Sequence, residues 1–168
     1  MDPSAGFAAT LELTRTSGIR IDRQGLLWHD GEPVAHEGFR RALYKWLDRL
    51  PAPDGRYIIR LDETRYAFLT VDDTPLVAKT LRHESQGTPT GEFIVSLSDG
   101  TEQRLDVSTL TVDKEGTLRA WVRDGRLEAR LNTAAAAALA PYLQETPQGW
   151  QLSSSGGLVH SLNTRQAP

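Results

Sequence analysis

The histidines are the side chains whose chemistry can be tested most directly against their spacing. His29 and His36 stand on either side of an Asp-Gly pair, with a glutamate close to each, so a general base or a ligand for a hard metal ion could be imagined there. No two histidines stand four residues apart, the spacing that places two metal ligands on one helix face. We therefore interpret both as exposed turn residues and predict no metal site.

Three further segments resemble chemical motifs without completing them. Ser153-Ser154-Ser155-Gly156-Gly157 lacks the first glycine of a nucleophile elbow and is interpreted as a turn between strands. Gly87-Thr88-Pro89-Thr90-Gly91 lacks the Gly-Lys-Ser/Thr of a phosphate-binding loop. Asp72 and Asp73, at the end of a predicted strand, are expected to cap a turn rather than to bind a cation.

Composition narrows the function classes further. The chain has no cysteine, which excludes thiolate nucleophiles, disulfides and sulfur-ligated zinc. Because no catalytic motif is complete, we expect no catalytic activity and no cofactor. A net charge of −3 provides no basic groove for nucleic acid. The first residues lack a signal-peptide pattern, and the longest apolar run, residues 134–143, is too short to span a bilayer. We expect a cytoplasmic protein that binds neither nucleic acid nor membranes.

The elements that would position a site are readable from hydrophobic periodicity. Alternating apolar residues around Asp22-x-x-Gly25 predict a β-hairpin. Phe39, Leu43, Trp46 and Leu47 belong to a stripe with helical spacing, which predicts a helix over residues 39–50 that ends at Pro51 and buries this stripe deeply. Further strands are predicted over residues 57–61, 66–71, 76–81, 93–97 and 103–107, the last two forming a hairpin around Asp99-Gly100.

The second half of the chain repeats the pattern of the first. Asp22 and Gly25 recur as Asp113 and Gly116 at one constant offset, and each turn is followed by a second Asp-Gly pair and then a helical segment. The second helix, over residues 133–143, is rich in alanine, and Pro141 should kink or end it near Ala140. The sequence therefore predicts an α+β fold made of two repeats of a strand-strand-helix-strand-strand unit, with antiparallel or mixed sheets.

These motifs resemble an uncharacterised bacterial family, number 1285 among the domains of unknown function. The matching residues are Ile19-x-Ile21-Asp22-x-x-Gly25, Trp28-His29-x-Gly31-x-Pro33-Val34, Gly55-x-Tyr57, Val71-Asp72-Asp73-Thr74-Pro75-Leu76 and Leu127-Glu128-Ala129. The resemblance covers most of residues 19–162. It implies a duplicated core, a C-terminal half loosely like a pleckstrin-homology fold, and a small-ligand pocket between the halves. It also implies a nucleotide-like ligand and a signalling role, without catalysis.

We divide the chain into an N-terminal arm (1–18), a first repeat (19–81), a loop with a connecting hairpin (82–108), a second repeat (109–163) and a tail (164–168). Pockets tend to form where two units meet, and tryptophan can provide the apolar floor of such a pocket. The candidate ligand-binding residues are each predicted at a strand end or turn near the boundary between the two repeats. They are Trp28, Asp73, Lys79 and Arg130.

Three functions from different classes follow. The leading hypothesis is a non-enzymatic binding protein or a regulatory or signalling protein whose small-molecule, nucleotide-like ligand lies between the repeats. The alternative is a protein-interaction module that adds a partner's strand to an open sheet edge beside the hairpin that carries Glu92, Asp99, Glu102 and Arg104. A hydrolase or transferase would need convergent acid-base groups, which the sequence does not locate. The oligomeric state is left open.

Overall fold

The computed structural model describes residues 15–85, 91–153 and 159–165. Most of the predicted arm, most of the Gly87–Gly91 loop, residues 154–157 of the predicted serine-glycine turn and the last three residues lie outside the described residues. The chain forms two compact units, Met1–Pro75 (unit 1) and Leu76–Pro168 (unit 2). In the described ranges, no helix is long and apolar enough to cross a membrane.

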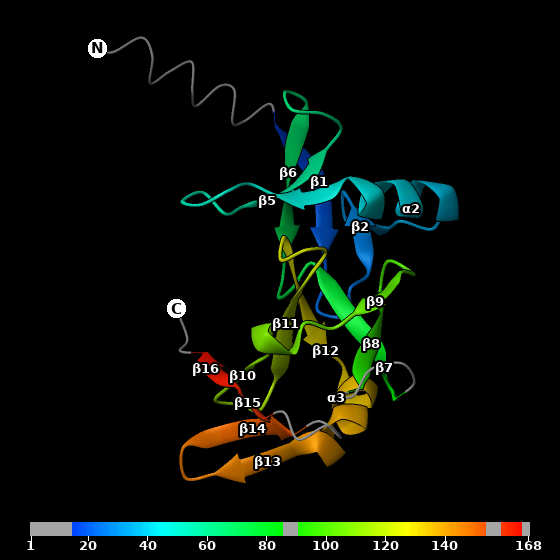
Figure 1. Cartoon of the computed structure of the whole chain (residues 1–168). Helices are drawn as coiled ribbons and strands as arrows, with labels where there is room; N and C mark the ends of the chain where they lie inside the picture. The colour runs from blue at the N-terminus through cyan, green and yellow to red at the C-terminus, as the bar shows by residue number, and fades with distance from the viewer. Residues whose placement is uncertain (1–14, 86–90, 154–158, 166–168) are drawn as a thin grey trace, which may run out of the picture. The chain divides into compact units, whose positions relative to one another are not determined.

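In the described part of unit 1, helix α2 lies against a mixed sheet (Figure 1). The strand order is β3-β2-β1-β6-β5-β4; β1 and β6 are parallel, and the other neighbours are antiparallel. The elements are β1 (Thr16–Ile21), β2 (Leu27–His29), β3 (Glu32–Pro33), α2 (Glu37–Trp46), β4 (Leu47–Arg49), β5 (Tyr57–Arg60) and β6 (Tyr66–Val71).

The predicted first hairpin is formed by β1 and β2, and the Asp22 carboxylate organises its turn. Asp22 Oδ1 accepts hydrogen bonds from the backbone nitrogens of Gln24 and Leu26, both at 2.9 Å. Asp22 Oδ2 accepts from the indole Nε1 of Trp28 at 2.8 Å. Gly25 takes a φ of +78°, which a residue with a side chain rarely adopts. The Asp-x-x-Gly spacing is therefore a structural turn signature.

Helix α2 is shorter than its apolar stripe predicted. It begins after His36, whose Nδ1 accepts a hydrogen bond from the backbone nitrogen of Phe39 at 3.1 Å. It ends at Trp46 rather than near Pro51, because Leu47 turns to an extended backbone and starts β4, where it pairs with Ile59. The predicted helix end was wrong because pairing with β5 satisfies this backbone in the sheet.

Deep burial was predicted for four residues of the apolar stripe and is confirmed for two of them. Leu43 and Leu47 are 2% and 3% exposed, whereas Phe39 is 42% exposed and Trp46 is half-buried. At the covered end of the helix, Tyr44 donates its hydroxyl hydrogen bond to the carbonyl of Gly25. The helix is thus fixed over the β1–β2 turn, and part of its apolar face extends beyond that contact.

Unit 2 contains a seven-stranded mixed sheet and a separate three-stranded sheet. The orders are β16-β10-β11-β12-β7-β8-β9 and β13-β14-β15, with β10–β16 and β12–β7 parallel. The elements are β7 (Leu76–Glu84), β8 (Glu92–Leu97), β9 (Glu102–Arg104), η1 (Val107–Thr109), β10 (Thr111–Asp113), β11 (Leu118–Val122), β12 (Leu127–Leu131), α3 (Thr133–Leu139), η2 (Ala140–Tyr142), β13 (Leu143–Thr146), β14 (Gly149–Ser153), β15 (Val159–Ser161) and β16 (Asn163–Arg165).

Three predicted features can be compared with this unit. The strand predicted over residues 76–81 as the end of the first repeat is β7, which pairs with β12 and β8 in the sheet of unit 2. The hairpin around Asp99-Gly100 is present as β8 and β9. Helix α3 ends at Leu139 and continues as a 3₁₀ turn that contains Pro141, as the proline predicted. Mixed sheets with few helices give the α+β class predicted from the sequence.

Candidate functional site

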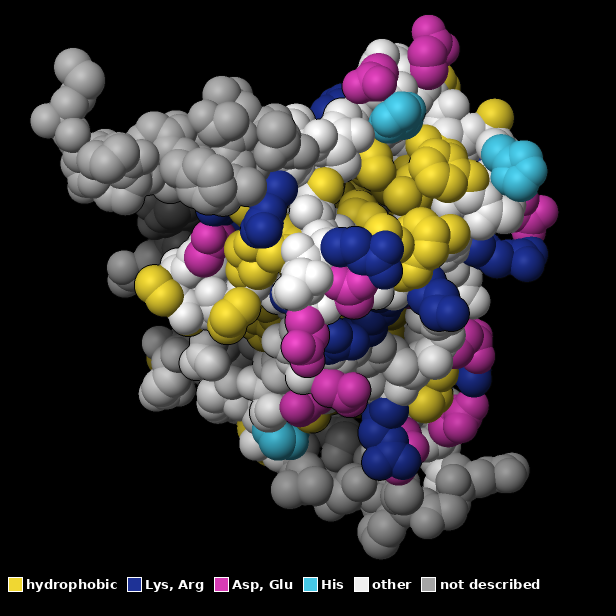
Figure 2. All heavy atoms as spheres, turned by 90° about the horizontal axis from the view of Figure 1, so that it is seen from above, with side chains coloured by type: hydrophobic (Ala, Val, Ile, Leu, Met, Phe, Trp, Pro, Cys, Tyr) yellow, Lys and Arg dark blue, Asp and Glu magenta, His cyan; other side chains and the backbone are white. Residues whose placement is uncertain are grey.

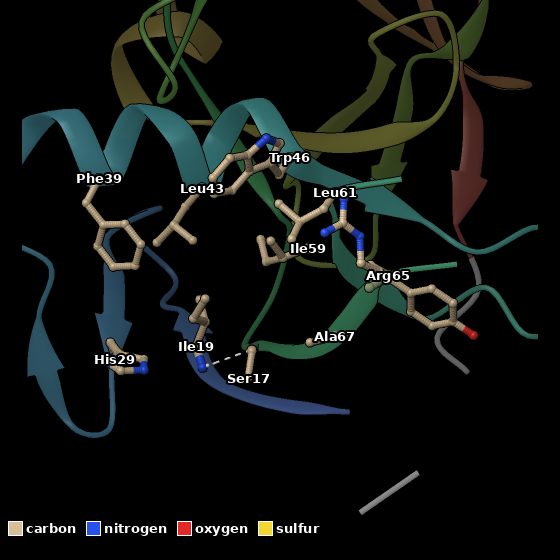
Figure 3. A pocket seen from close by; sticks show the side chains of 11 residues that line it. Ser17, Ile19, His29, Phe39, Leu43, Trp46, Ile59, Leu61, Arg65 and Ala67 are labelled. Carbon is tan, nitrogen blue, oxygen red and sulfur yellow. Dashed lines mark hydrogen bonds between the residues drawn. The ribbon is translucent and has the colours of Figure 1, made fainter. Parts of the chain in front are cut away.

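A hydrophobic pocket of about 420 Å³ lies beside α2 in unit 1 (Figure 3). The helix contributes Phe39, Leu43 and Trp46 to its wall. The facing wall includes Ile19, Ile59 and Ala67, which come from three neighbouring strands.

Helical and strand periodicity together place these side chains on one cavity. Phe39, Leu43 and Trp46 stand four and three residues apart, so they share one face of α2. Ile59 is paired with Ala67, and directly paired residues lie on the same face of a sheet. The same rule places His29 beside Ile19. The pocket is therefore the meeting of one helix face with one sheet face.

The pocket is open because the helix covers only part of that sheet face. Exposure rises from 2% at Leu43 to 42% at Phe39, and Leu61, on the facing side, is 51% exposed. Figure 2 shows hydrophobic side chains gathered on the surface, with histidine, basic and acidic side chains around them. Large apolar side chains left open around a concavity are a usual sign of a binding site.

Polar side chains of the pocket have defined partners. The hydroxyl of Ser17 donates to the carbonyl of Phe68 at 2.7 Å and accepts from the backbone nitrogen of Ile19 at 3.1 Å. His29 Nε2 lies 3.5 Å from a carboxylate oxygen of Asp30, with both side chains well exposed. Ser17 is thus occupied in holding the strands together, and His29 lies at the solvent edge.

Arg65 is the permanently charged residue of the lining. Its Nε donates to the carboxylate of Asp62 within the turn between β5 and β6, and 73% of its side chain is exposed. The side-chain and backbone hydrogen bonds from Arg65 hold the pKa of Asp62 well below its usual range. Asp62 therefore stays ionised, and the turn that carries Arg65 is fixed at neutral pH.

The four residues predicted for the site lie elsewhere. Trp28 uses its indole nitrogen in the Asp22 turn, and the Arg20 guanidinium lies 5.4 Å above its ring. Asp73 follows β6 and is half-buried, Lys79 is an exposed residue of β7, and Arg130 is a half-buried residue of β12. None of them lines the pocket. Trp28 and Asp73 belong to unit 1 and the other two to unit 2, so their shared site stays a prediction.

Sequence reasoning did not assign Phe39 and Trp46 to a pocket, because a helical apolar stripe is normally core. The signal that could have revealed the pocket was the small size of the residues that face these two aromatic side chains. A wall that includes Ala67 and Ser17 offers too little volume to cover two large aromatic side chains. That signal requires the register of β5 and β6, which the sequence alone does not provide.

The predicted sheet edge is present in unit 2 as β9, the last strand of the seven-stranded order. Its charges are paired with neighbours: Glu102 with Arg82 at 2.8 Å and Arg104 with Glu92 at 2.6 Å. Such charges protect an edge strand from further pairing. Among the residues that the structure describes, no three His, Asp or Glu side chains gather as a metal site would require.

Comparisons with known proteins agree with this architecture. No protein-family model matches the sequence, and no curated protein matches it. A DUF1285 family protein from Silicibacter pomeroyi DSS-3 superposes with a TM-score of 0.70 at 21% identity, covering 89% of this chain and 81% of that chain. One from Shewanella baltica OS155 gives 0.61 at 17% identity, covering 76% and 93%. The chain therefore has the fold of the DUF1285 family, the uncharacterised family that its sequence resembles.

Proposed function

We propose that this protein binds a small, mainly apolar molecule in the pocket of unit 1 and does not transform it. The observation that carries the proposal is an apolar cavity of about 420 Å³ with Phe39 left 42% exposed at its wall. Ligand pockets usually range from about 300 to 1,000 Å³ and are lined mostly by hydrophobic and aromatic side chains. A bound apolar molecule would remove Phe39 and Leu61 from water, which favours binding.

Binding is better supported than catalysis because of what the lining offers. General acid-base work needs groups that converge on one reacting atom. Ser17 is committed to Phe68 and Ile19, and His29 is an exposed residue that lies beside the carboxylate of Asp30. No carboxylate is among the residues that line the pocket.

Two earlier expectations receive less support from these contacts. A nucleotide-like ligand would need several donors for its phosphates, and the lining includes Arg65 as its one permanently charged side chain. A strand-addition module would need a long open edge, whereas β9 has three residues and its charges are paired.

We propose further that the two units arose by duplication, as the turn chemistry predicted. Asp113 repeats the Asp22 turn: its Oδ1 accepts from the backbone nitrogens of Glu115 and Thr117, both at 2.9 Å. Gly116 takes a φ of +81°, close to the +78° of Gly25. In each unit, a three-stranded antiparallel meander begins with a strand that also has a parallel neighbour from the end of the unit.

Thermal-shift measurements with neutral probes such as decanol and naphthalene test the binding proposal. A ligand that binds the folded state raises the Tm by mass action. Phe39→Ser should abolish the rise because it removes an exposed wall of the pocket. Leu26→Ser is the matched control, since Leu26 is 57% exposed in the same unit and does not line the pocket. A Tm that rises for neither probe, or equally in the Phe39→Ser protein, would contradict the proposal.

A further inference from the structure

We infer that the ligand of the unit 1 pocket is an amphiphilic monocarboxylate, with its apolar chain against α2 and its carboxylate at Arg65. This inference rests on the proposed function and adds a head group and a direction to it. Three features carry it: the arrangement of the lining, its charge, and the exposure of Arg65.

The lining has a nitrogen-bearing side chain at each end, His29 or Arg65, and each lies beside an apolar side chain. Figure 3 shows Phe39 and His29 towards one end, Arg65 and Leu61 towards the other, and Leu43 between them. An elongated molecule with a chain and one polar end fits this order of side chains better than a compact polar molecule does.

The charge of the lining selects an acidic end group. It includes one arginine and one histidine and no aspartate or glutamate. A guanidinium has five N–H donors in a planar fork that matches the two oxygens of a carboxylate. Arg65 uses Nε towards Asp62, which leaves the fork with donors beyond that bond.

The position of Arg65 suits a charged head group because it does not require burial. With 73% of its side chain exposed, a carboxylate beside it keeps much of its hydration and avoids the large cost of burying an ion. The turn beneath it is already ordered: Asp62 Oδ1 accepts from the backbone nitrogens of Thr64 at 3.0 Å and Arg65 at 2.8 Å. Little ordering of the chain is therefore needed when the head group binds.

Isothermal titration calorimetry of the full chain at pH 7 and low salt tests the inference with decanoate, decanol and decylamine, each below its micelle concentration. Decanoate should bind about fivefold tighter than decanol, as one exposed charge pair provides, and decylamine should bind most weakly. The preference for decanoate over decanol should shrink as salt is added, because the contact with Arg65 is open to solvent.

Two arginine variants locate the head group. Arg65→Gln should remove the preference for decanoate over decanol. Arg41→Gln is the matched control, because Arg41 is 74% exposed and also pairs with an acid within its own element, but does not line the pocket. It should leave all three affinities unchanged.

The outcomes separate the two proposals. Decanol and decanoate binding equally, decylamine binding best, or an unchanged preference in the Arg65→Gln protein would overturn the carboxylate inference while the apolar pocket stands. Binding of none of the three probes would overturn the pocket itself. Loss of decanol binding as well in Arg65→Gln would also count against the inference, since the side chain would then be structural.

Discussion

Helices α2 and α3 occupy the same place in the succession of elements in their units, and their surroundings differ. Each follows a three-stranded meander and is capped in the same manner: His36 Nδ1 accepts from the backbone nitrogen of Phe39, and Asn132 Oδ1 from that of Ala135. One turn later, Leu43 and Leu139 are both buried, at 2% and 0% exposed. The two helices thus share a cap and an anchor.

The two helices differ at the residue whose backbone nitrogen is capped. Phe39 is 42% exposed, whereas Ala135 is completely buried. The strand before α2 is β3, a two-residue edge strand, while α3 follows β12, which is flanked by the long strand β7. Helix α3 packs against both β7 and β12. In unit 2 the small side chain of Ala135 is covered where α3 packs against the sheet, whereas in unit 1 the large side chain of Phe39 stays partly exposed beside the pocket.

The largest effects should come from the shared anchor. Leu139→Ala should destabilise unit 2 by about 3 to 4 kcal/mol, because a fully packed site loses contacts and keeps a cavity. Leu43→Ala should destabilise unit 1 by about 2 to 3 kcal/mol, because Leu43 already borders an open pocket and its site can adapt. Urea unfolding with hydrogen exchange in each unit measures both. A greater loss for Leu43→Ala would show that the pocket end is the better packed one.

The next largest effect should come from exchanging the residues whose amides are capped, Ala135 in α3 and Phe39 in α2. Ala135→Phe forces a ring into a filled site and should destabilise unit 2 by about 2 to 3 kcal/mol. Phe39→Ala should destabilise unit 1 by less than about 1 kcal/mol, because much of the ring is already in water. Thermal unfolding and decanol titration of both variants measure this. If Ala135→Phe is tolerated and creates decanol binding, the packing of α3 against the sheet does not close unit 2.

The features that the sequence predicted well depend on local chemistry. The Asp22 turn, the hairpin of β8 and β9, and the end of α3 at Pro141 each follow from a few adjacent residues with restricted backbone choices. Such signals hold whatever lies elsewhere in the chain.

The features that were missed depend on long-range pairing. Leu47 starts a strand because β5 lies beside it, and β7 pairs in unit 2 although it follows unit 1 directly in the chain. The pocket depends on the same kind of information, since the exposure of Phe39 is set by which strands lie opposite α2. Residue types alone therefore located the apolar stripe but not its open end.

The two aspartate turns should lose stability together in acid. Burial raises the pKa of Asp22, but hydrogen bonds from Leu26, Trp28 and Gln24 lower it more, so the pKa lies below the ordinary value of 3.8. The pKa of Asp113 is lowered in the same manner by the bonds from Thr117 and Glu115, against the effect of burial. Each ionised carboxylate therefore stabilises its turn above about pH 4, and this contribution is lost as the pH falls through the folded-state value.

Substitution shows whether the turns are energetically equivalent. Asp22→Ala should destabilise unit 1 by about 2 kcal/mol, because it leaves the partly buried indole nitrogen of Trp28 without its acceptor as well as two turn amides. Asp113→Ala, without such an indole, should destabilise unit 2 by about 1 kcal/mol. Urea titrations from pH 3 to 7 measure both losses. In each variant, the free energy of unfolding of the substituted unit should fall less steeply as the pH is lowered. Equal losses would mean that the Trp28 bond adds no more than the ion pair of Asp113 with Arg119, at 3.7 Å, does in unit 2.

The smallest effects should come from the caps, which also test whether the two helix starts are equivalent. Asn132→Ala should destabilise unit 2 by about 1 kcal/mol, the usual loss when a side chain that satisfies an N-terminal amide is removed. His36→Ala should destabilise unit 1 by less, about 0.5 kcal/mol, because its bond is longer, at 3.1 Å against 2.9 Å, and the start of α2 is exposed to water that can replace it. Hydrogen exchange of the Phe39 and Ala135 amides reports each cap directly. Faster exchange at Ala135 in the Asn132→Ala protein, with Phe39 unchanged, is the expected pattern. If His36→Ala had as large an effect as Asn132→Ala, the exposed start of α2 would depend on its cap as strongly as the start of α3 does.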